Sequence, residues 1–344
     1  MSRHFAGVFL LLLLFLSQHL FAQRFSSKSK SPRGSIYSIN KKYSTFGVSV
    51  NAMNYFGDIA PKKDFSSTDL ALTRPGFGLF FTRRLGPKFS TRVSLNWGRI
   101  KGDDYESADP ADDLARYRYV RNLQFRNDIK ELSVVGVFDF AQNLATYRSR
   151  KSVVPYIFAG VAVFHHNPKA QVPDQDVNNG NAPFPEAGDW VALPPLMTEG
   201  NSYKKVQLAI PFGLGLRFKL DERWDLAFEA GYRHLFFDYI DDVSGDYVDL
   251  GSLSSDLARA LSDRSREVTA VESGETRQTG VIPNRMESYI STFDGNTYTT
   301  IAGYGRDAID NIRGNHSDKD IYIMTGFQVS YVIPNSRFKR AKFR

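Results

Sequence analysis

The clearest structural pattern in this sequence lies in KKVQLAIPFGLGLRFKL, residues 204–220. Apolar side chains occupy every second position, which is the period of a β-strand, where successive side chains point to opposite faces. The apolar face holds Val206, Leu208, Ile210, Phe212, Leu214, Leu216 and Phe218. The opposite face holds Gln207, Ala209, Pro211, Gly213, Gly215 and Arg217. A long strand with one wholly apolar face is typical of a transmembrane strand, which needs about 9–11 residues.

Seven further segments have the composition of strands, and six of them show the same alternation. They are residues 43–53, 76–84, 89–101, 129–140, 153–164, 224–236 and 321–333. Residues 153–164 are apolar on both faces, so the sequence predicts a strand there without orienting it. Aromatic residues make up 14% of the chain, which agrees with the aromatic girdles of membrane barrels.

The connections between these eight segments alternate strictly in length. Long connections span residues 56–74, 102–122, 166–203 and 240–318, and short ones span 85–88, 141–152 and 221–223. A soluble β-sandwich could contain similar strands but has no reason to sort its loops by length. We therefore predict an all-β protein, an eight-stranded antiparallel transmembrane β-barrel with long extracellular loops, short periplasmic turns and both termini in the periplasm.

The N-terminus has the layout of a secretory signal peptide. Arg3 precedes an apolar run from Phe5 to Leu16, and Ala22 offers a small residue for cleavage. The run is shorter than the roughly 20 residues of a spanning helix, although an uncleaved anchor helix is the alternative. We expect a signal peptide at 1–22, a flexible basic periplasmic arm at 23–42, the barrel at 43–333 with its long loop at 240–318, and a basic periplasmic tail at 334–344. The chain contains no cysteine, so no disulfide and no cysteine-linked lipid anchor can form.

Several segments together resemble one family, the PorG-like outer-membrane proteins of Bacteroidota. They are NYFGDI (54–59), FRNDI (125–129) with ELS (131–133), PYIF (155–158), NPKA (167–170), PLMTEG (195–200), IPFGLG (210–215) and DYIDDVS (238–244). The resemblance extends from about residue 43 to residue 333. It implies an outer-membrane barrel that belongs to the type IX secretion machinery and associates with the periplasmic ring built by PorK and PorN.

Charged residues fall on the faces that alternation assigns to the barrel interior. They are Arg92, Glu131, Asp139, Arg217, Asp225, Glu229 and Arg233. The interior of an eight-stranded barrel is just wide enough to be filled by side chains, and unpaired buried charges are strongly disfavoured. We predict a lumen charge network in which Arg92, Glu131, Arg217, Glu229 and Arg233 take part. The alternative is a pore or a proton path.

Two clusters could suggest site chemistry, and both have a simpler interpretation. His165 and His166 lie where the fifth strand leaves the membrane, but no nearby nucleophile or acid completes a catalytic set, as a lipid A-modifying enzyme would require. Asp238, Asp241, Asp242 and Asp246 fit no calcium-loop spacing, so we expect a solvated acidic rim. We predict that the protein is not an enzyme and uses no catalytic residue, cofactor or metal ion.

Both ends of the mature chain are basic. The C-terminal tail contains Arg337, Lys339, Arg340 and Lys342, which we expect to dock an acidic periplasmic surface, because charged patches orient and speed association. The alternative is that basic tails aid solubility or contact lipid head groups.

We predict no nucleic-acid partner, because an exported protein does not meet nucleic acid. The predicted function is an outer-membrane component of type IX secretion that docks periplasmic ring proteins. The alternative function is an adhesin-like or receptor-like surface barrel whose long loops bind a partner.

Overall fold

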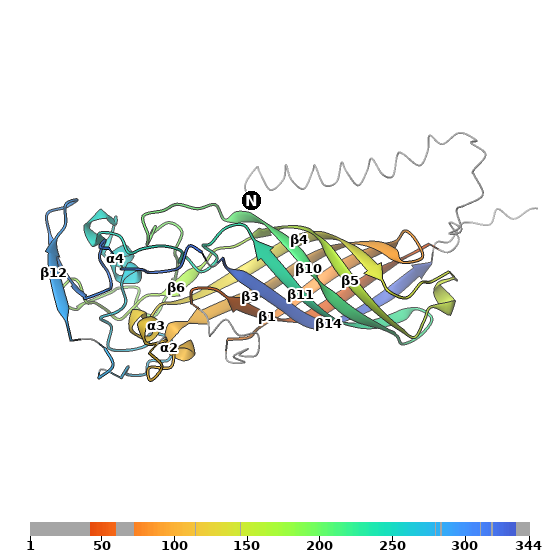
Figure 1. The fold of residues 1–344 in the computed structure, drawn as a ribbon, viewed down its shortest axis with the longest axis horizontal. Coiled ribbons are helices and arrows are strands. Elements are labelled where there is room, and N and C mark those ends of the chain that lie inside the picture. Colours follow the sequence, from red (N-terminus) through yellow and green to blue (C-terminus); the bar gives the residue numbers. More distant parts are fainter. Residues whose placement is uncertain are drawn as a thin grey trace, which may run out of the picture. The chain divides into compact units, whose positions relative to one another are not determined.

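Eight long antiparallel strands pair edge to edge to form a closed barrel in the computed structural model of this chain (Figure 1). The structure describes residues 42–59 and 72–334, apart from 114, 145, 279, 283, 310 and 318. The barrel strands are β1 (Tyr43–Phe56), β2 (Arg74–Arg84), β3 (Phe89–Asp103), β4 (Gln124–Asp139), β5 (Val153–His165), β10 (Val206–Lys219), β11 (Trp224–Leu235) and β14 (Ile321–Pro334).

Closure of the barrel depends on pairing between its first and last strands, which no loop joins. The order of the barrel strands is β3-β2-β1-β14-β11-β10-β5-β4, and β3 also pairs with β4. Strand β1 pairs with β14 over its whole length, from Tyr43 opposite Pro334 to Phe56 opposite Ile321. No barrel strand therefore has an open edge, which lipid would not tolerate. The prediction of a closed eight-stranded antiparallel barrel is confirmed.

The connections sort by length at the two ends of the barrel. Residues 85–88, 140–152 and 220–223 make the connections at one end, called here the short-turn end. Residues 57–73, 104–123, 166–205 and 236–320 make those at the other, called the long-loop end. Strands β1, β3 and β4 extend the predicted ranges by a few residues toward the long-loop end, because their ladders continue past the apolar positions.

The outer surface of the barrel is a band of exposed apolar side chains. Leu214 is 61% exposed, Val161 is 64% exposed and Phe327 is 58% exposed. Trp97 on β3 and Trp224 on β11 also lie on this outer surface. A soluble protein rarely exposes one large continuous apolar patch, and a band that encircles a closed barrel matches the lipid-facing surface of an outer-membrane barrel. The barrel is therefore a transmembrane barrel of the outer-membrane type.

None of the helices in the described ranges is long and apolar enough to cross a membrane.

Strand β5, which the sequence could not orient, points its aromatic residues inward. Tyr156, Phe158 and Phe164 are buried in the lumen, and Ile157 and Val161 face outward. Pairing with β4 and β10 fixes this orientation, because Phe158 lies opposite Val137 and Gly213, which both face inward. Apolar residues on the inner face are compatible with a charged lumen, because aromatic rings can pack against guanidinium groups.

The long loops fold into short elements at the long-loop end (Figure 1), and these elements together are called here the cap. Its helices are α2 (Asp104–Ser107), α3 (Arg116–Arg121), α4 (Asp256–Ser262) and the 3-10 turn η3 (Leu250–Ser252). Its strands are β6 (Lys169–Gln171), β7 (Gln175–Asp176), β8 (Ala182–Pro183), β9 (Trp190–Ala192), β12 (Met286–Ile290) and β13 (Thr297–Ile301). The 3-10 turn η2 (Tyr147–Ser149) lies at the short-turn end. The loop at 240–318 thus contains regular elements, with β12 and β13 forming a hairpin.

Candidate functional site

The lumen contains buried ion pairs stacked along the barrel. Near the short-turn end, Asp139 on β4 accepts hydrogen bonds from Arg84 on β2 and from Arg217 on β10, the latter with Nη1 3.2 Å from Oδ2. Beside them, Arg150 Nη2 donates to Asp225 Oδ1 at 2.8 Å. Both carboxylates of this layer are paired, and because two arginines share Asp139 the layer carries one more guanidinium than carboxylates.

The middle layer is built around Glu229 on β11. Arg92 on β3 forms a bidentate pair with it, Nη1 to Oε2 at 2.6 Å and Nη2 to Oε1 at 2.9 Å. The Tyr156 hydroxyl donates to the same carboxylate at 2.9 Å. The Arg92 guanidinium also lies 5.0 Å from the centre of the Phe158 ring. Two parallel N–H···O bonds fix both position and orientation, so these four side chains hold β3, β5 and β11 together across the lumen.

The layer nearest the long loops is built around Glu131 on β4, which is 2% exposed. It accepts hydrogen bonds from Arg233 Nε at 3.2 Å, from the Tyr322 hydroxyl at 2.8 Å and from Asn96 Nδ2 at 2.8 Å. The donors come from β11, β14 and β3, so this carboxylate also links strands from opposite sides of the barrel. Its charge is matched by one guanidinium and two neutral donors.

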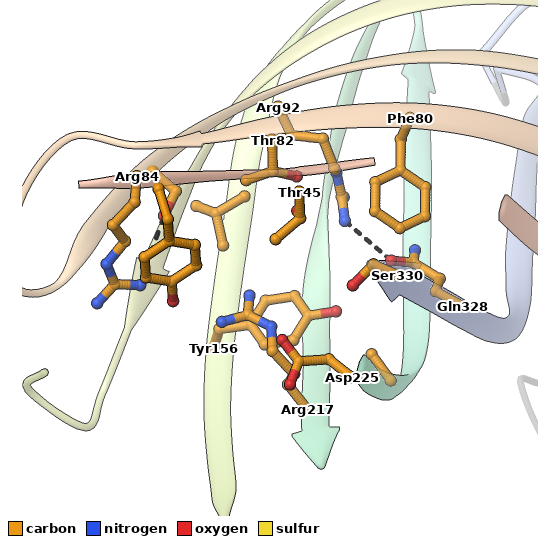
Figure 2. A pocket seen from close by; sticks show the side chains of 14 residues that line it. Thr45, Phe80, Thr82, Arg84, Arg92, Tyr156, Arg217, Asp225, Gln328 and Ser330 are labelled. Carbon is orange, nitrogen blue, oxygen red and sulfur yellow. Dashed lines mark hydrogen bonds between the residues drawn. The ribbon is translucent and has the colours of Figure 1, made fainter. Parts of the chain in front are cut away.

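Small cavities separate these layers. Figure 2 shows one of about 30 Å³, lined by Tyr156, Arg217, Asp225 and other side chains that enter from different strands. Two others in the lumen measure about 20 Å³ each. A single water molecule needs roughly 10–15 Å³, so each cavity has room for only about one to three waters. Among the described residues, the side chains that line these cavities come from all sides of the barrel, and the cavities between them are small.

The cap is tied together by two buried arginines that reach all four long loops. Arg121, in the loop between β3 and β4, donates from Nη2 to the carbonyl oxygen of Asp58 at 2.7 Å and pairs with Asp104 at 2.8 Å. It also donates to the carbonyl oxygen of Arg313. Arg313, in the loop between β11 and β14, donates from Nη1 to Glu199 Oε1 in the loop between β5 and β10 at 2.8 Å. Hydrogen bonds to charged groups contribute about 1.5–3 kcal/mol each, so these contacts make the cap one unit.

Tyr55 joins the cap to the barrel. Its hydroxyl lies 2.6 Å from Asp241 Oδ2 and 2.8 Å from Asp320 Oδ1. Burial raises the pKa of both carboxyl groups well above their usual range. A tyrosine hydroxyl has a single proton to donate. Both contacts are hydrogen bonds when one of the two carboxyls is protonated and donates to the tyrosine oxygen.

The chain matches a family model. The model describes a domain of unknown function, DUF6089, and it matches residues 35–187, a little under half of the chain. No curated protein matches the sequence.

Solved structures of outer-membrane proteins are similar in outline. They include OprG from Pseudomonas aeruginosa (TM-score 0.36, 10% identity, covering 86% of this chain and 99% of that one). A major outer-membrane protein of Thermus thermophilus gives a TM-score of 0.36 at 10% identity, and the match covers 84% of this chain and 99% of that one. Ail from Yersinia pestis, in complex with the heparin analogue sucrose octasulfate, gives a TM-score of 0.33 at 8% identity. The match covers 85% of this chain and 99% of Ail. The assignment of this chain to the membrane depends on its own apolar band.

The five lumen residues named from the sequence all point into the barrel. The structure brings Arg92 together with Glu229 and Arg233 together with Glu131, and it places Arg217 beside Asp139. Sequence reasoning missed Arg84 and Arg150. Arg84 is the last residue of β2, where alternation gives little guidance. Arg150 lies in a connecting segment, which has no alternation to assign it to a face, yet it is 8% exposed, because it reaches from the turn into the lumen to pair with Asp225.

The expected solvated acidic rim is wrong for three of its four members. Asp241 and Asp242 are 1% and 2% exposed and Asp238 is also buried, whereas Asp246 is exposed. Each buried member has its own partners. Asp238 accepts from Ser244, Asp241 contacts Tyr55, and Asp242 accepts from the hydroxyls of Thr198 and Tyr203. Within the described ranges, no three His, Asp or Glu side chains gather as metal ligands.

The two adjacent histidines have different surroundings. His166 is fully buried and stacks on Tyr203, with ring centres 5.8 Å apart and an interplanar angle of 12°. Burial lowers the pKa of His166 to about 4, so its ring is neutral and packs as an aromatic residue. His165 is the outward-facing last residue of β5, opposite Lys130 of β4.

The residues proposed for docking lie outside the described part of the chain. They are Arg337, Lys339, Arg340 and Lys342. The predicted signal peptide and all of the basic arm except Lys42 also lie outside it.

Proposed function

We propose that this protein is a closed outer-membrane barrel that acts by binding other proteins, as a component of the type IX secretion machinery that docks periplasmic ring proteins. One observation carries the first half of this proposal, namely the three layers of buried ion pairs that fill the lumen. Cavities of about 20–30 Å³ between the layers support a barrel that does not conduct. In this proposal the protein works through the surfaces at the two ends of the barrel.

The second half depends on the resemblance to the PorG-like proteins of Bacteroidota, which supplies PorK-like and PorN-like ring proteins as partners. In this proposal the short-turn end and both termini face the periplasm. Because β1 pairs with β14, the chain segments that precede Tyr43 and follow Pro334 leave the barrel from neighbouring strands. Their basic residues are then concentrated over a small area, and several charges acting together can orient a partner of opposite charge.

The test is reversal of Arg337, Lys339, Arg340 and Lys342 to glutamate in the full-length protein. The barrel should assemble normally, and recovery of ring proteins by co-purification should fall, because like charges then face the acidic partner. The wild-type interaction should weaken as salt rises, since exposed charges are screened over about 10 Å at 0.1 M. A matched control reverses four cations of the long-loop end, Arg116, Lys204, Arg285 and Lys319, and should leave recovery unchanged. Equal recovery from both variants at every salt concentration would refute docking through the tail.

A second candidate function, a surface receptor or adhesin, is favoured by the cap. The β12–β13 hairpin exposes Met286, Ile290 and Phe293, with Ile290 70% and Phe293 68% exposed. Exposed apolar residues gathered on one element indicate a protein-binding surface.

A deletion strain separates the two candidates. The secretion component predicts loss of export of type IX cargo while the outer membrane remains intact. The receptor predicts normal export, and a binding defect that is reproduced by changing Ile290 and Phe293 to serine. Intact export together with normal surface binding in the deletion strain would contradict both.

A further inference from the structure

The apolar band ends in basic side chains on one side of the barrel. On β3 the outward residues Leu95 and Trp97 are followed by Arg99, and on β5 Val161 and Val163 are followed by His165. On β4 the last outward apolar residue before the long-loop end is Leu132, and the next outward residue is Lys130. The group is called here the basic patch, and it comprises Arg99, Arg126, Lys130, His165, Lys169 and Lys205.

Strand pairing brings these residues side by side. Lys130 lies opposite His165 on β5 and opposite Trp97 on β3. His165 in turn lies opposite Val206, the residue after Lys205. Arg126 lies opposite Lys169 of β6. Three neighbouring barrel strands, the residue before β10 and the edge of the cap therefore contribute to one surface.

The depth of the basic patch matches a lipid headgroup region. Outward apolar residues on β5 run from Val153 to Val163, which covers about 25 Å along the barrel axis at the usual strand rise and tilt. That is the height of the apolar band of an outer-membrane barrel. His165 is the next outward residue, so the basic patch begins where acyl chains end and headgroups start.

The opposite side of the barrel has a different rim. The last outward residues at the long-loop ends of β1 and β14 are Asn54, Phe56, Ile321 and Ile323, with no lysine or arginine among them. Exposed Lys319 lies two residues before β14, and His234 takes the corresponding place on β11. Most of the basic residues at this rim therefore lie around β3, β4 and β5. A general preference for charge at the membrane surface would distribute them evenly.

Little within the described structure neutralises the basic patch. Asp128 is the one carboxylate on the outward face of β4, and Arg99 Nε pairs with it at 2.6 Å. The Arg126 guanidinium lies 3.9 Å from the centre of the Trp190 ring, which holds it in place without cancelling its charge. Lys130 is exposed and has no ion-pair partner among the described residues. Lysine binds phosphate as a point charge, and clusters of cations beside a membrane bind anionic headgroups.

We propose that the basic patch binds the phosphate groups of a phosphorylated lipid in the leaflet at the long-loop end, with the acyl chains of that lipid lying against Leu132, Val163 and Leu208. The inference requires that the barrel spans a bilayer, but it does not depend on the ring proteins or on the surface partner proposed above. An experiment that disproves lipid binding would therefore leave the proposed protein-binding functions untouched, and the converse also holds.

The experiment is a titration of the purified full-length protein in detergent with diphosphoryl lipid A, followed by native mass spectrometry. The test variant is Lys130→Gln with Lys205→Gln. The matched control is Lys151→Gln with Lys319→Gln, which removes the same charge at two exposed sites outside the basic patch. Each lysine beside an anionic surface contributes about 1 kcal/mol, so the test variant should bind about thirtyfold more weakly at low salt.

Two further measurements, together with the control variant, identify which part of the lipid is recognised. Dephosphorylated lipid A should bind the wild-type protein no more tightly than diphosphoryl lipid A binds the test variant. Inorganic phosphate alone at the same concentration should not displace the lipid, since it lacks acyl chains. The control variant should bind as the wild type does. Equal affinity of the test variant and the wild type, an equal loss in the control variant, or tight binding of the dephosphorylated lipid would each overturn the proposal.

Discussion

Removing one partner of the Arg92–Glu229 pair should strongly destabilise the barrel. The two side chains are 8% and 11% exposed, and they are joined by two hydrogen bonds of 2.6 and 2.9 Å. Glu229→Met leaves the Arg92 guanidinium buried without a counterion and leaves the Tyr156 hydroxyl without its acceptor. Breaking a buried pair in this way costs about 3–5 kcal/mol. Arg92→Met should cost a similar amount for the converse reason.

The double variant Arg92→Met, Glu229→Met should recover most of that loss, because replacing both members of a buried pair by apolar residues is often nearly neutral. The assay is urea unfolding in phospholipid vesicles, followed by tryptophan fluorescence, with all four proteins forming a double-mutant cycle. The control pair is Arg99–Asp128, which has the same 2.6 Å separation but side chains 40% and 41% exposed. Its coupling energy should stay below about 1 kcal/mol. Additive effects of Arg92→Met and Glu229→Met would refute the pairing described for the lumen.

Three further predictions concern the band and the cap. Leu214→Arg should block stable assembly, because a charge near the membrane midplane costs about 2–4 kcal/mol. Leu220→Arg in a short turn, at the same 61% exposure, should assemble. Equal yields of folded barrel from the two variants would show that the strand is misplaced in the membrane. Arg313→Met should loosen the cap by about 3–5 kcal/mol while the barrel stays folded, because Glu199 is left buried and unpaired, and limited proteolysis would detect the change. Burial raises the pKa of Asp242 to about 6, against an ordinary value near 4. The folded cap therefore holds a proton that the unfolded chain releases, and the stability contributed by this group is complete below pH about 4 and lost as the pH rises through about 6. Proteolysis of the cap in urea should accelerate between about pH 4 and about pH 6.5, and less so in Asp242→Asn. An unchanged slope in that variant would assign the pH dependence to other groups.

The strands and their lipid-facing sides could be predicted because both follow from a local pattern. Val206, Leu208, Phe212 and Leu214 alternate with inward residues, and a period of two assigns each side chain to a face before any partner strand is known. Strand β5 was the exception. Its inner face carries Tyr156 and other aromatic residues that pack against guanidinium groups, so apolar character did not distinguish lumen from lipid there.

The amino-acid sequence is enough to predict the number of strands, the alternation of long and short connections, and the inward position of most strand charges, but not that of Arg84. The tertiary structure sets how those charges pair, because the partners come from strands far apart in the chain, as Arg92 and Glu229 do. It also decided that Asp241 and Arg150, polar residues in connecting segments, are buried and not solvated. Loop residues have no periodic pattern that reports their burial. Whether a loop side chain meets solvent depends on how the other loops fold over it.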